Sequence, residues 1–127
     1  ALINQTKKAM EENKDSKMWE LCSGDITKAG GRTAFDAMRL GDEAGKKVVD
    51  TYIEYIGIGA TNIVNIFQPE MLCFGGGICN EGETLLAPLR TYVKKNQYNK
   101  RTEKNTELCV ACLGNDAGII GAALVEY

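Results

Sequence analysis

The most informative absence in this sequence of 127 residues is histidine, which does not occur at all. Histidine is the side chain that most often moves protons in enzymes near neutral pH, and it is the commonest metal ligand. The sequence also lacks a serine paired with a base and a pair of carboxylates between apolar motifs. The residues themselves therefore indicate a chain that binds a ligand without supplying the chemistry, and we predict no catalytic residue in it.

An excess of basic charge and a long apolar run are also missing. The net charge of −2 and the pI of about 5.2 do not provide the positive field that attracts nucleic acid. The longest uncharged stretch, residues 55–68, is too short to span a bilayer and contains three amide side chains. The N-terminus shows no signal-peptide pattern. We therefore expect a cytoplasmic protein without nucleic-acid or membrane partners.

The five cysteines are an odd number, which favours reduced thiols over a disulfide framework. Cys109 and Cys112 have a C-x-x-C spacing, but they lie in the apolar run "ELCVACL", which is typical of a strand. Positions three apart in a strand face opposite sides. A zinc site would need further ligands from a chain that has no histidine. We expect these two cysteines to act as small buried hydrophobic residues, and we predict no metal site.

The first half of the sequence predicts mostly helices. The expected segments are a helix over 1–13, a loop over 14–32, a short helix over 33–40 and a long helix over 42–68. Gly41 suits the end of the short helix, Asp42 suits the cap of the long one, and Pro69 suits its end.

The long helix changes character along its length. After Glu54 it carries no charged residue, so its second half is expected to be enclosed on all sides. Gly57 and Gly59 each lower the helix propensity by about 1 kcal/mol relative to alanine. Close packing against a neighbouring element would explain both glycines.

The second half of the sequence predicts strands and helices in alternation. The expected segments are a buried strand over 71–74, a helix over about 81–95 in two parts that meet at Pro88, a strand over 107–113 and a closing helix capped by Asn115 or Asp116. Two strands joined by a crossover helix are parallel, which indicates an α/β fold, mostly helical, with a small parallel sheet of about two strands. Parallel sheets normally lie inside larger ones, so the chain is expected to be part of a larger domain.

Three consecutive glycines, Gly75 to Gly77, stand where the first strand gives way to the next helix. The stretch "FGGGICNEG" lacks the lysine and hydroxyl residue of a P-loop, and its spacing does not match a Rossmann fingerprint. Two interpretations stay open: a tight turn with helix packing, or bare backbone for an anion at the edge of the sheet. Gly114 and Asn115 allow a similar choice between a helix cap and a place on the same edge.

Two segments of the sequence together resemble one family. The segments "DEAGKKVVDTYIEYIGIGATNIVNIFQPEMLCFGGGICNEGETLLAPLR" and "ACLGNDAGIIGAALVEY" resemble the C-terminal region of bacterial glucokinases of the ROK family (repressors, open reading frames and kinases). The shared features are a long helix that ends in Pro69 and Glu70, a strand with a glycine triplet, the "LLAP" helix and the closing "LGNDAGIIGAA".

The resemblance implies a sugar kinase of the actin-like ATPase superfamily, in which two RNase H-like lobes close over ATP, Mg²⁺ and glucose. By that resemblance, residues 1–127 form the C-terminal portion of the ATP-binding lobe, helical over 1–68 and strand–glycine–helix–strand–helix over 70–127. The ATP-binding role is carried to Gly75, Gly76 and Gly77, with Ile78 and Asn80 as neighbours.

The resemblance also implies what the chain does not contain. The phosphate-binding loop, the catalytic aspartate, the sugar contacts and the zinc-binding cysteines of the family precede this region. The chain by itself is therefore expected to be inactive, whereas the parent would phosphorylate glucose to glucose 6-phosphate at the entry to glycolysis, as a homodimer.

Three alternatives stay open. The parent is a sugar-sensing repressor of the same family if a DNA-binding segment precedes the region. It is another ROK kinase, acting on fructose or N-acetylmannosamine, if the absent sugar contacts differ. The third alternative is an independent interaction module that pairs through an exposed edge strand.

Overall fold

The computed structural model describes residues 1–98, 105–112 and 116–124. The chain divides into two compact units, residues 1–56 and residues 57–127, and the division falls inside the longest helix, α4 (Glu43–Phe67). No helix among the described residues is long and apolar enough to cross a membrane. The predicted α/β composition is confirmed, because helices dominate and the described strands form one two-stranded parallel sheet.

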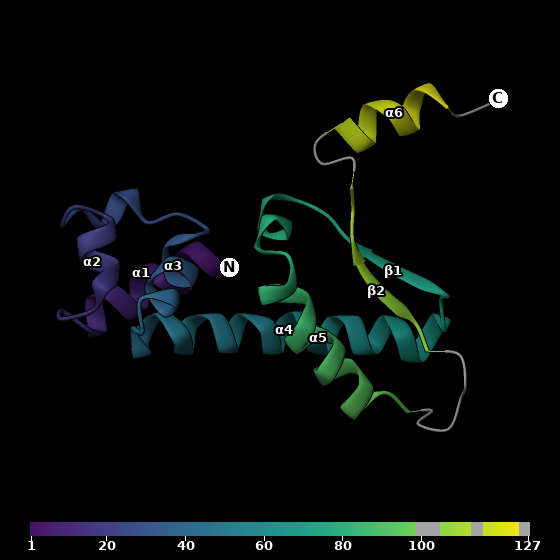
Figure 1. Cartoon of the computed structure of the whole chain (residues 1–127), viewed down its shortest axis with the longest axis horizontal. Coiled ribbons are helices and arrows are strands. Elements are labelled where there is room, and N and C mark those ends of the chain that lie inside the picture. The colour runs from purple at the N-terminus through teal and green to yellow at the C-terminus, as the bar shows by residue number, and fades with distance from the viewer. Residues whose placement is uncertain (99–104, 113–115, 125–127) are drawn as a thin grey trace. The chain divides into compact units, whose positions relative to one another are not determined.

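The first unit is entirely helical. It comprises α1 (Leu2–Glu12), α2 (Lys17–Leu21), the 3₁₀ helix η1 (Ile26–Lys28), α3 (Thr33–Arg39) and the first part of α4 (Figure 1). Its core consists of fully buried side chains from different helices, namely Thr6, Met10, Met18, Ala34, Phe35, Ala37 and Val49. The helices predicted over 1–13, 33–40 and 42–68 are confirmed to within two residues at each end.

The loop predicted over 14–32 is wrong, because two short helices lie there. Ser16 precedes α2, and its hydroxyl accepts a hydrogen bond from the amide of Met18 at 3.2 Å. Asp25 precedes η1, and its carboxylate accepts one from the amide of Thr27 at 2.9 Å. Both are N-cap interactions, which satisfy amides that a helix leaves unpaired at its start.

The junction between α3 and α4 follows the predicted signals. Gly41 has a φ of +80°, the left-handed conformation that glycine adopts readily after a helix. Asp42 is buried, and its carboxylate accepts hydrogen bonds from the amides of Gly45 (2.6 Å) and Lys17 (2.8 Å) and from the hydroxyl of Ser16 (3.1 Å). Asp42 therefore caps α4 and also ties it to the start of α2.

The second unit contains the end of α4, the sheet and the helices after it. Its elements are β1 (Met71–Phe74), the 3₁₀ helix η2 (Gly77–Glu81), α5 (Glu83–Asn96), β2 (Glu107–Val110) and α6 (Ala117–Ala123). The two strands run parallel and side by side (Figure 1), from the pair Met71 and Glu107 to the pair Phe74 and Val110. The buried side chains of α5 and β2 form its core, namely Leu85, Leu86, Leu89, Val93 and Leu108.

Four expectations for this unit need correction. The second strand ends at Val110 instead of residue 113. Pro88 lies within one continuous helix, α5, where two parts were expected. The closing helix has Asp116 at its N-cap position, but the side chain makes no capping hydrogen bond, and Asn115 lies outside the described residues. A 3₁₀ helix, η2, begins at Gly77, the last of the three glycines, and ends at Glu81, shortly before α5.

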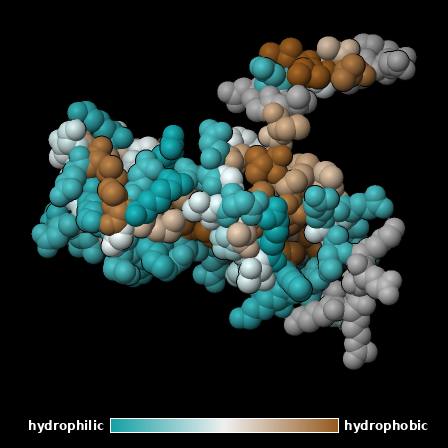
Figure 2. Space-filling view, in the orientation of Figure 1, coloured by the Kyte–Doolittle hydropathy of each residue, from teal (hydrophilic) through white to brown (hydrophobic). Residues whose placement is uncertain are grey.

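The second half of α4 and strand β1 were predicted to be buried on all sides, and this prediction is also wrong. On the second half of α4, one side is buried, but Ile66 and Phe67 are 71% and 72% exposed. In β1, Met71 is 54% exposed, so the strand predicted to be buried is covered on one face only. Figure 2 shows brown, hydrophobic atoms on the surface of this unit. The apolar composition of α4 and β1 predicted that both sides of each element are buried, but the described residues bury one side only.

The two glycines of α4 differ in their surroundings. A Cβ atom on Gly57 would lie 2.6 Å from Cδ1 and 2.8 Å from Cγ of Tyr92 on α5, so the predicted close packing is confirmed there. A Cβ atom on Gly59 would meet nothing within 4 Å, so the same expectation is wrong at this position.

Candidate functional site

The candidate site lies at the carboxyl edge of the sheet, where both parallel strands end. Phe74 and Val110 are the last paired residues, and the amide of Ala111 still donates to the carbonyl of Phe74 at 2.8 Å. The glycine turn leaves β1 at this point, so Gly75 begins beside the residue that follows β2. In open α/β sheets, ligands bind at this edge.

The three glycines form a sharp turn into a short 3₁₀ helix. Gly76 has a φ of +95°, a conformation that favours glycine strongly. Its carbonyl accepts a hydrogen bond from the amide of Cys79 at 3.0 Å, and the carbonyl of Cys79 accepts one from Gly82 at 3.1 Å. Gly82 has a φ of +55° and leads directly into α5. The chain therefore changes direction twice in this stretch, at Gly76 and at Gly82.

The space around the triplet distinguishes the two interpretations of its glycines. Cβ atoms built on Gly75, Gly76 and Gly77 would each meet nothing within 4 Å in the part of the chain that the structure describes. Backbone conformation explains why position 76 is a glycine, but it does not explain the glycines at positions 75 and 77. Close packing against other described residues accounts for none of the three, unlike Gly57 with its Tyr92 contact.

The 3₁₀ helix after the triplet has an inner and an outer side. Cys79 and Glu81 are buried, whereas Asn80 is exposed and Ile78 is half-buried. Burial also raises the pKa of the Cys79 thiol. The structure therefore places the three glycines and Asn80 on open surface, with Ile78 at its border. Gly114 and Asn115, the other predicted residues of this edge, lie outside the described residues.

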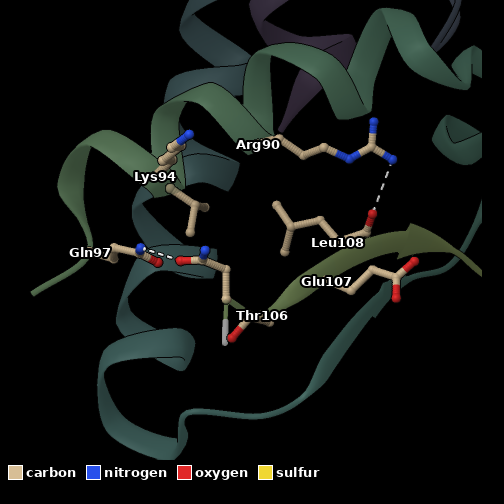
Figure 3. A pocket seen from close by; sticks show the side chains of 8 residues that line it. Arg90, Lys94, Gln97, Thr106, Glu107 and Leu108 are labelled. Atoms are coloured by element: carbon tan, nitrogen blue, oxygen red, sulfur yellow. Dashed lines mark hydrogen bonds between the residues drawn. The ribbon is translucent and has the colours of Figure 1, made fainter. Parts of the chain in front are cut away.

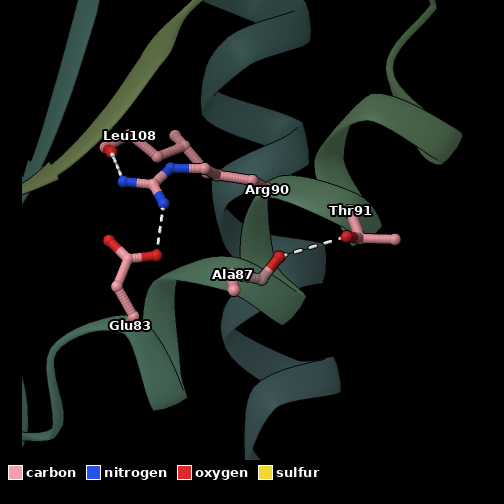
Figure 4. A network of polar contacts seen from close by, with 5 residues as sticks. All are labelled: Glu83, Ala87, Arg90, Thr91 and Leu108. Atoms are coloured by element: carbon pink, nitrogen blue, oxygen red, sulfur yellow. Dashed lines mark hydrogen bonds and ion pairs between the residues drawn. The ribbon is translucent and has the colours of Figure 1, made fainter.

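Arg90 connects α5 to the sheet, a role that sequence reasoning missed. Its guanidinium donates to the Glu83 carboxylate at 2.6 Å and to the Leu108 carbonyl at 3.2 Å (Figure 4). Glu83 and Arg90 side chains are 69% and 46% exposed, so the ion pair contributes little to stability. Its effect is geometric, because it joins the first turn of α5, directly after the glycine turn, to the middle of β2. An i, i+7 spacing in a helix carries no sequence signal of such a contact.

A hollow of about 310 Å³ lies at the other end of the sheet. It is lined by α5 and by the residues that lead into β2, with Arg90 and Lys94 on one side and Glu107 on the other (Figure 3). The Gln97 side-chain amide donates to Asn105 at 2.9 Å across it. Because Glu107 is the first residue of β2, this hollow is at the amino edge of the sheet. It is therefore separate from the glycine turn.

The cysteines and acids of the described segments form no metal centre. No group of three or more side chains from histidine, cysteine, aspartate and glutamate lies close enough there to hold an ion. Of the two cysteines of the C-x-x-C spacing, Cys109 is half-buried and Cys112 is exposed, so the expectation of burial is wrong for Cys112. Cys22 and Cys79 are buried, and Cys73 is exposed. Cys112 follows the end of β2 instead of lying within the strand.

The chain is similar to known proteins along most of its length. A sequence model of the ROK family matches residues 7–126. The glucokinase of Halalkalibacterium halodurans is 34% identical over 113 residues, which are 87% of this chain and 33% of that protein. The glucokinase of Thermotoga maritima is 35% identical over 104 residues, which are 81% of this chain and 32% of that protein.

A solved structure shows the same fold. A ROK family glucokinase from Streptomyces griseus, in complex with glucose and AMPPNP, matches 97% of this chain with a TM-score of 0.83 at 25% identity. The match covers 40% of that chain. The chain thus spans about a third of the length of the curated relatives it matches. The predicted partial lobe of this kinase fold is confirmed at the level of the fold.

Proposed function

Because the chain belongs to the ROK family, we propose that it forms the nucleotide side of a sugar kinase that transfers a phosphoryl group from ATP to glucose. Two relatives, 34% and 35% identical to it, are glucokinases, and a structural neighbour was solved with glucose and AMPPNP. In this proposal Gly75, Gly76 and Gly77, with Ile78 and Asn80 beside them, line the nucleotide.

The observation that carries the proposal is the open space at Gly75 and Gly77. Neither glycine has a positive φ, and among the described residues neither has a neighbour within 4 Å of a Cβ position, so those residues give no reason for the missing side chains. Both flank a turn at the carboxyl edge of a parallel sheet, where nucleotides bind in α/β folds. A bound nucleotide close to the main chain supplies the missing reason.

The contribution of this chain would be binding and orientation. Phosphoryl transfer depends on positioning and on stabilisation of charge, and ATP supplies the group that is transferred. The turn offers bare backbone, and Arg90 holds α5 behind it against β2. We assign no ligand of Mg²⁺ to the described residues, because no suitable cluster occurs among them. Mg²⁺ is commonly held by nucleotide phosphates with one or two carboxylates, which do not have to come from this chain.

Gly75→Val tests the proposal in the protein that contains this chain. Gly75 has no positive φ, and a Cβ atom there would meet nothing within 4 Å among the described residues. We expect the KM for ATP to rise about tenfold or more, with the KM for glucose changed less than about twofold, because the substitution affects one substrate's binding. Initial rates with each substrate varied in turn give both constants.

Gly59→Ala is the matched control, since it also adds a side chain where nothing lies within 4 Å, but on α4 instead of the turn. Both KM values of this variant should equal those of the unchanged protein. Equal rises of the two constants in Gly75→Val, or no rise in either, would contradict the proposed place of the nucleotide. Absence of sugar phosphorylation by the unchanged protein would contradict the kinase assignment itself.

A further inference from the structure

Two cysteines from distant parts of the sequence lie directly opposite each other in the sheet. Cys73 of β1 pairs in register with Cys109 of β2, and their sulfur atoms are 2.9 Å apart. They are 36 positions apart in the sequence, and the C-x-x-C motif instead links Cys109 with Cys112. The structure thus joins Cys109 to a different cysteine from the one the motif suggests.

The pair lies on the face of the sheet that the second unit leaves open. Leu108 is buried and projects from β2 toward α5 (Figure 3). Successive side chains of a strand point to opposite faces, so Cys109 and its register partner Cys73 lie on the face away from α5. On that face Cys73 is exposed and Cys109 is half-buried. As far as the described residues show, Cys73 is therefore accessible to small molecules in solution.

The spacing of the strands suits a covalent bond between the two sulfurs. Neighbouring strands of a sheet lie about 4.8 Å apart. Disulfides join residues whose Cα atoms are about 4.4 to 6.8 Å apart. Directly opposite residues therefore meet this requirement, and the two sulfurs have to approach from 2.9 Å to about 2.05 Å for the bond to form.

We propose that Cys73 and Cys109 form a redox-reactive dithiol that a peroxide-class oxidant converts into a disulfide across the two parallel strands. Cys73, the more exposed partner, attacks one peroxide oxygen as a thiolate, the O–O bond breaks, and hydroxide leaves and takes up a proton to become water. Its sulfur is then a sulfenic acid. Cys109 attacks that sulfur, the S–S bond forms and the S–O bond breaks. A second water carries away the oxygen and the proton of Cys109, so hydrogen peroxide is reduced and the two thiols are oxidised.

The state of Cys109 agrees with this order of events. Its hydrogen bond to Cys73 raises the pKa of the Cys109 thiol to about 11. Cys109 therefore keeps its proton at neutral pH, and its sulfur shares a hydrogen bond with the sulfur of Cys73 at 2.9 Å. Cys109 acts second, after the sulfenic acid has formed on Cys73, and its proton leaves with the second water. The inference does not depend on nucleotide binding.

Peptide mapping of the 127-residue chain after treatment with hydrogen peroxide tests the proposal. Trypsin leaves Cys73 in peptide 48–90 and Cys109 in peptide 105–127, since neither peptide contains an internal lysine or arginine. We expect a linked pair of these peptides, two hydrogen atoms lighter than their sum, and the loss of two of the five free thiols counted after denaturation. Dithiothreitol should restore both thiols.

Single serine variants identify the sulfurs. Cys73→Ser and Cys109→Ser should each abolish the link, whereas Cys112→Ser and Cys79→Ser, the matched controls on the same two peptides, should retain it. A disulfide within peptide 105–127 would overturn the proposal in favour of the C-x-x-C pair. A link that survives Cys73→Ser, a disulfide between two chains, or peroxide treatment that leaves all five thiols free would overturn it as well.

Discussion

The two units of this chain achieve burial in different ways. In the unit of residues 1–56, short helices surround fully buried side chains, and its buried carboxylate, Asp42, has three hydrogen-bond donors. In the unit of residues 57–127, α5 covers one face of the sheet, while the other face exposes Met71 and Cys73. Helix α4 belongs to both, and within the second unit it exposes Ile66 and Phe67.

The difference follows from the kind of element in each unit. A helix buries one stripe and can be satisfied by a few neighbours, whereas a parallel sheet needs cover on both faces. The second unit has two strands and one covering helix among its described residues. It therefore contains both the candidate site and exposed apolar side chains. Substitutions of buried residues in the first unit are therefore expected to lower the free energy of unfolding strongly. Substitutions of exposed residues in the second unit are expected to change it little.

The largest expected effect is that of Phe35→Ala in the first unit. Phe35 is fully buried, and removal of a buried aromatic ring costs about 3–5 kcal/mol. Urea unfolding followed by the fluorescence of Trp19, the single tryptophan, measures the loss in this unit, because its indole N–H donates to the Met10 carbonyl at 2.8 Å.

Tyr98→Ala is the control for the second unit, where this aromatic ring is 92% exposed. It should change the free energy of unfolding by less than about 0.5 kcal/mol. A loss in Phe35→Ala below about 1 kcal/mol, or an equal loss in both variants, would remove the contrast between the units.

An intermediate effect is expected for Asp42→Ala, which removes the acceptor of three hydrogen bonds. The loss should be about 1–3 kcal/mol, because an N-cap is lost and buried donors remain without a partner. Trp19 fluorescence in urea again provides the measurement. Asp36→Ala is the matched control, since this aspartate is more exposed and pairs with Arg39 at the surface, so its loss should be under about 1 kcal/mol.

The same carboxylate predicts a pH dependence. Burial by itself would raise the pKa of Asp42, but hydrogen bonds from the Gly45 amide, the Lys17 amide and the Ser16 hydroxyl outweigh it and lower the pKa below its ordinary value of 3.8. A lowered pKa adds stability above the unfolded value, and this stability is lost as the pH falls through the folded value. Unfolding midpoints from about pH 5 downward should therefore fall more steeply in the unchanged chain than in Asp42→Ala. Parallel curves would contradict the role of this carboxylate.

The smallest expected effects form a pair of opposite sign within α4. Gly57→Ala should destabilise the chain by about 1 kcal/mol, because overpacking against the Tyr92 ring exceeds the gain in helix propensity. Gly59→Ala should stabilise it by about 0.5–1 kcal/mol, because its Cβ meets nothing within 4 Å. Urea unfolding followed by far-UV circular dichroism compares them. Two stabilising substitutions would show that the Tyr92 ring moves aside at little cost.

Local signals in the sequence predicted much of the fold. Gly41 and Asp42 marked the junction of α3 and α4, because a left-handed glycine and an N-cap act on amides within one turn. The same kind of signal at Ser16 and Asp25 was missed, since helices of five and three residues are too short to show a hydrophobic period. The bounds of β1 were predicted, but its exposure was not, because apolar composition indicates a need for cover and not its source.

The sequence by itself determined the bounds of α1, α3 and α4 to within two residues, the place where the chain turns at the glycine triplet, and the family to which the chain belongs. These features depend on neighbours within a few residues, or on motifs read in order. Only the tertiary structure decided that Cys73 lies opposite Cys109, that Gly57 meets Tyr92 while Gly59 meets nothing, and that the sides of Gly75 and Gly77 are open. Each of these depends on the register and packing of segments that lie far apart in the sequence, and no local pattern encodes such distances.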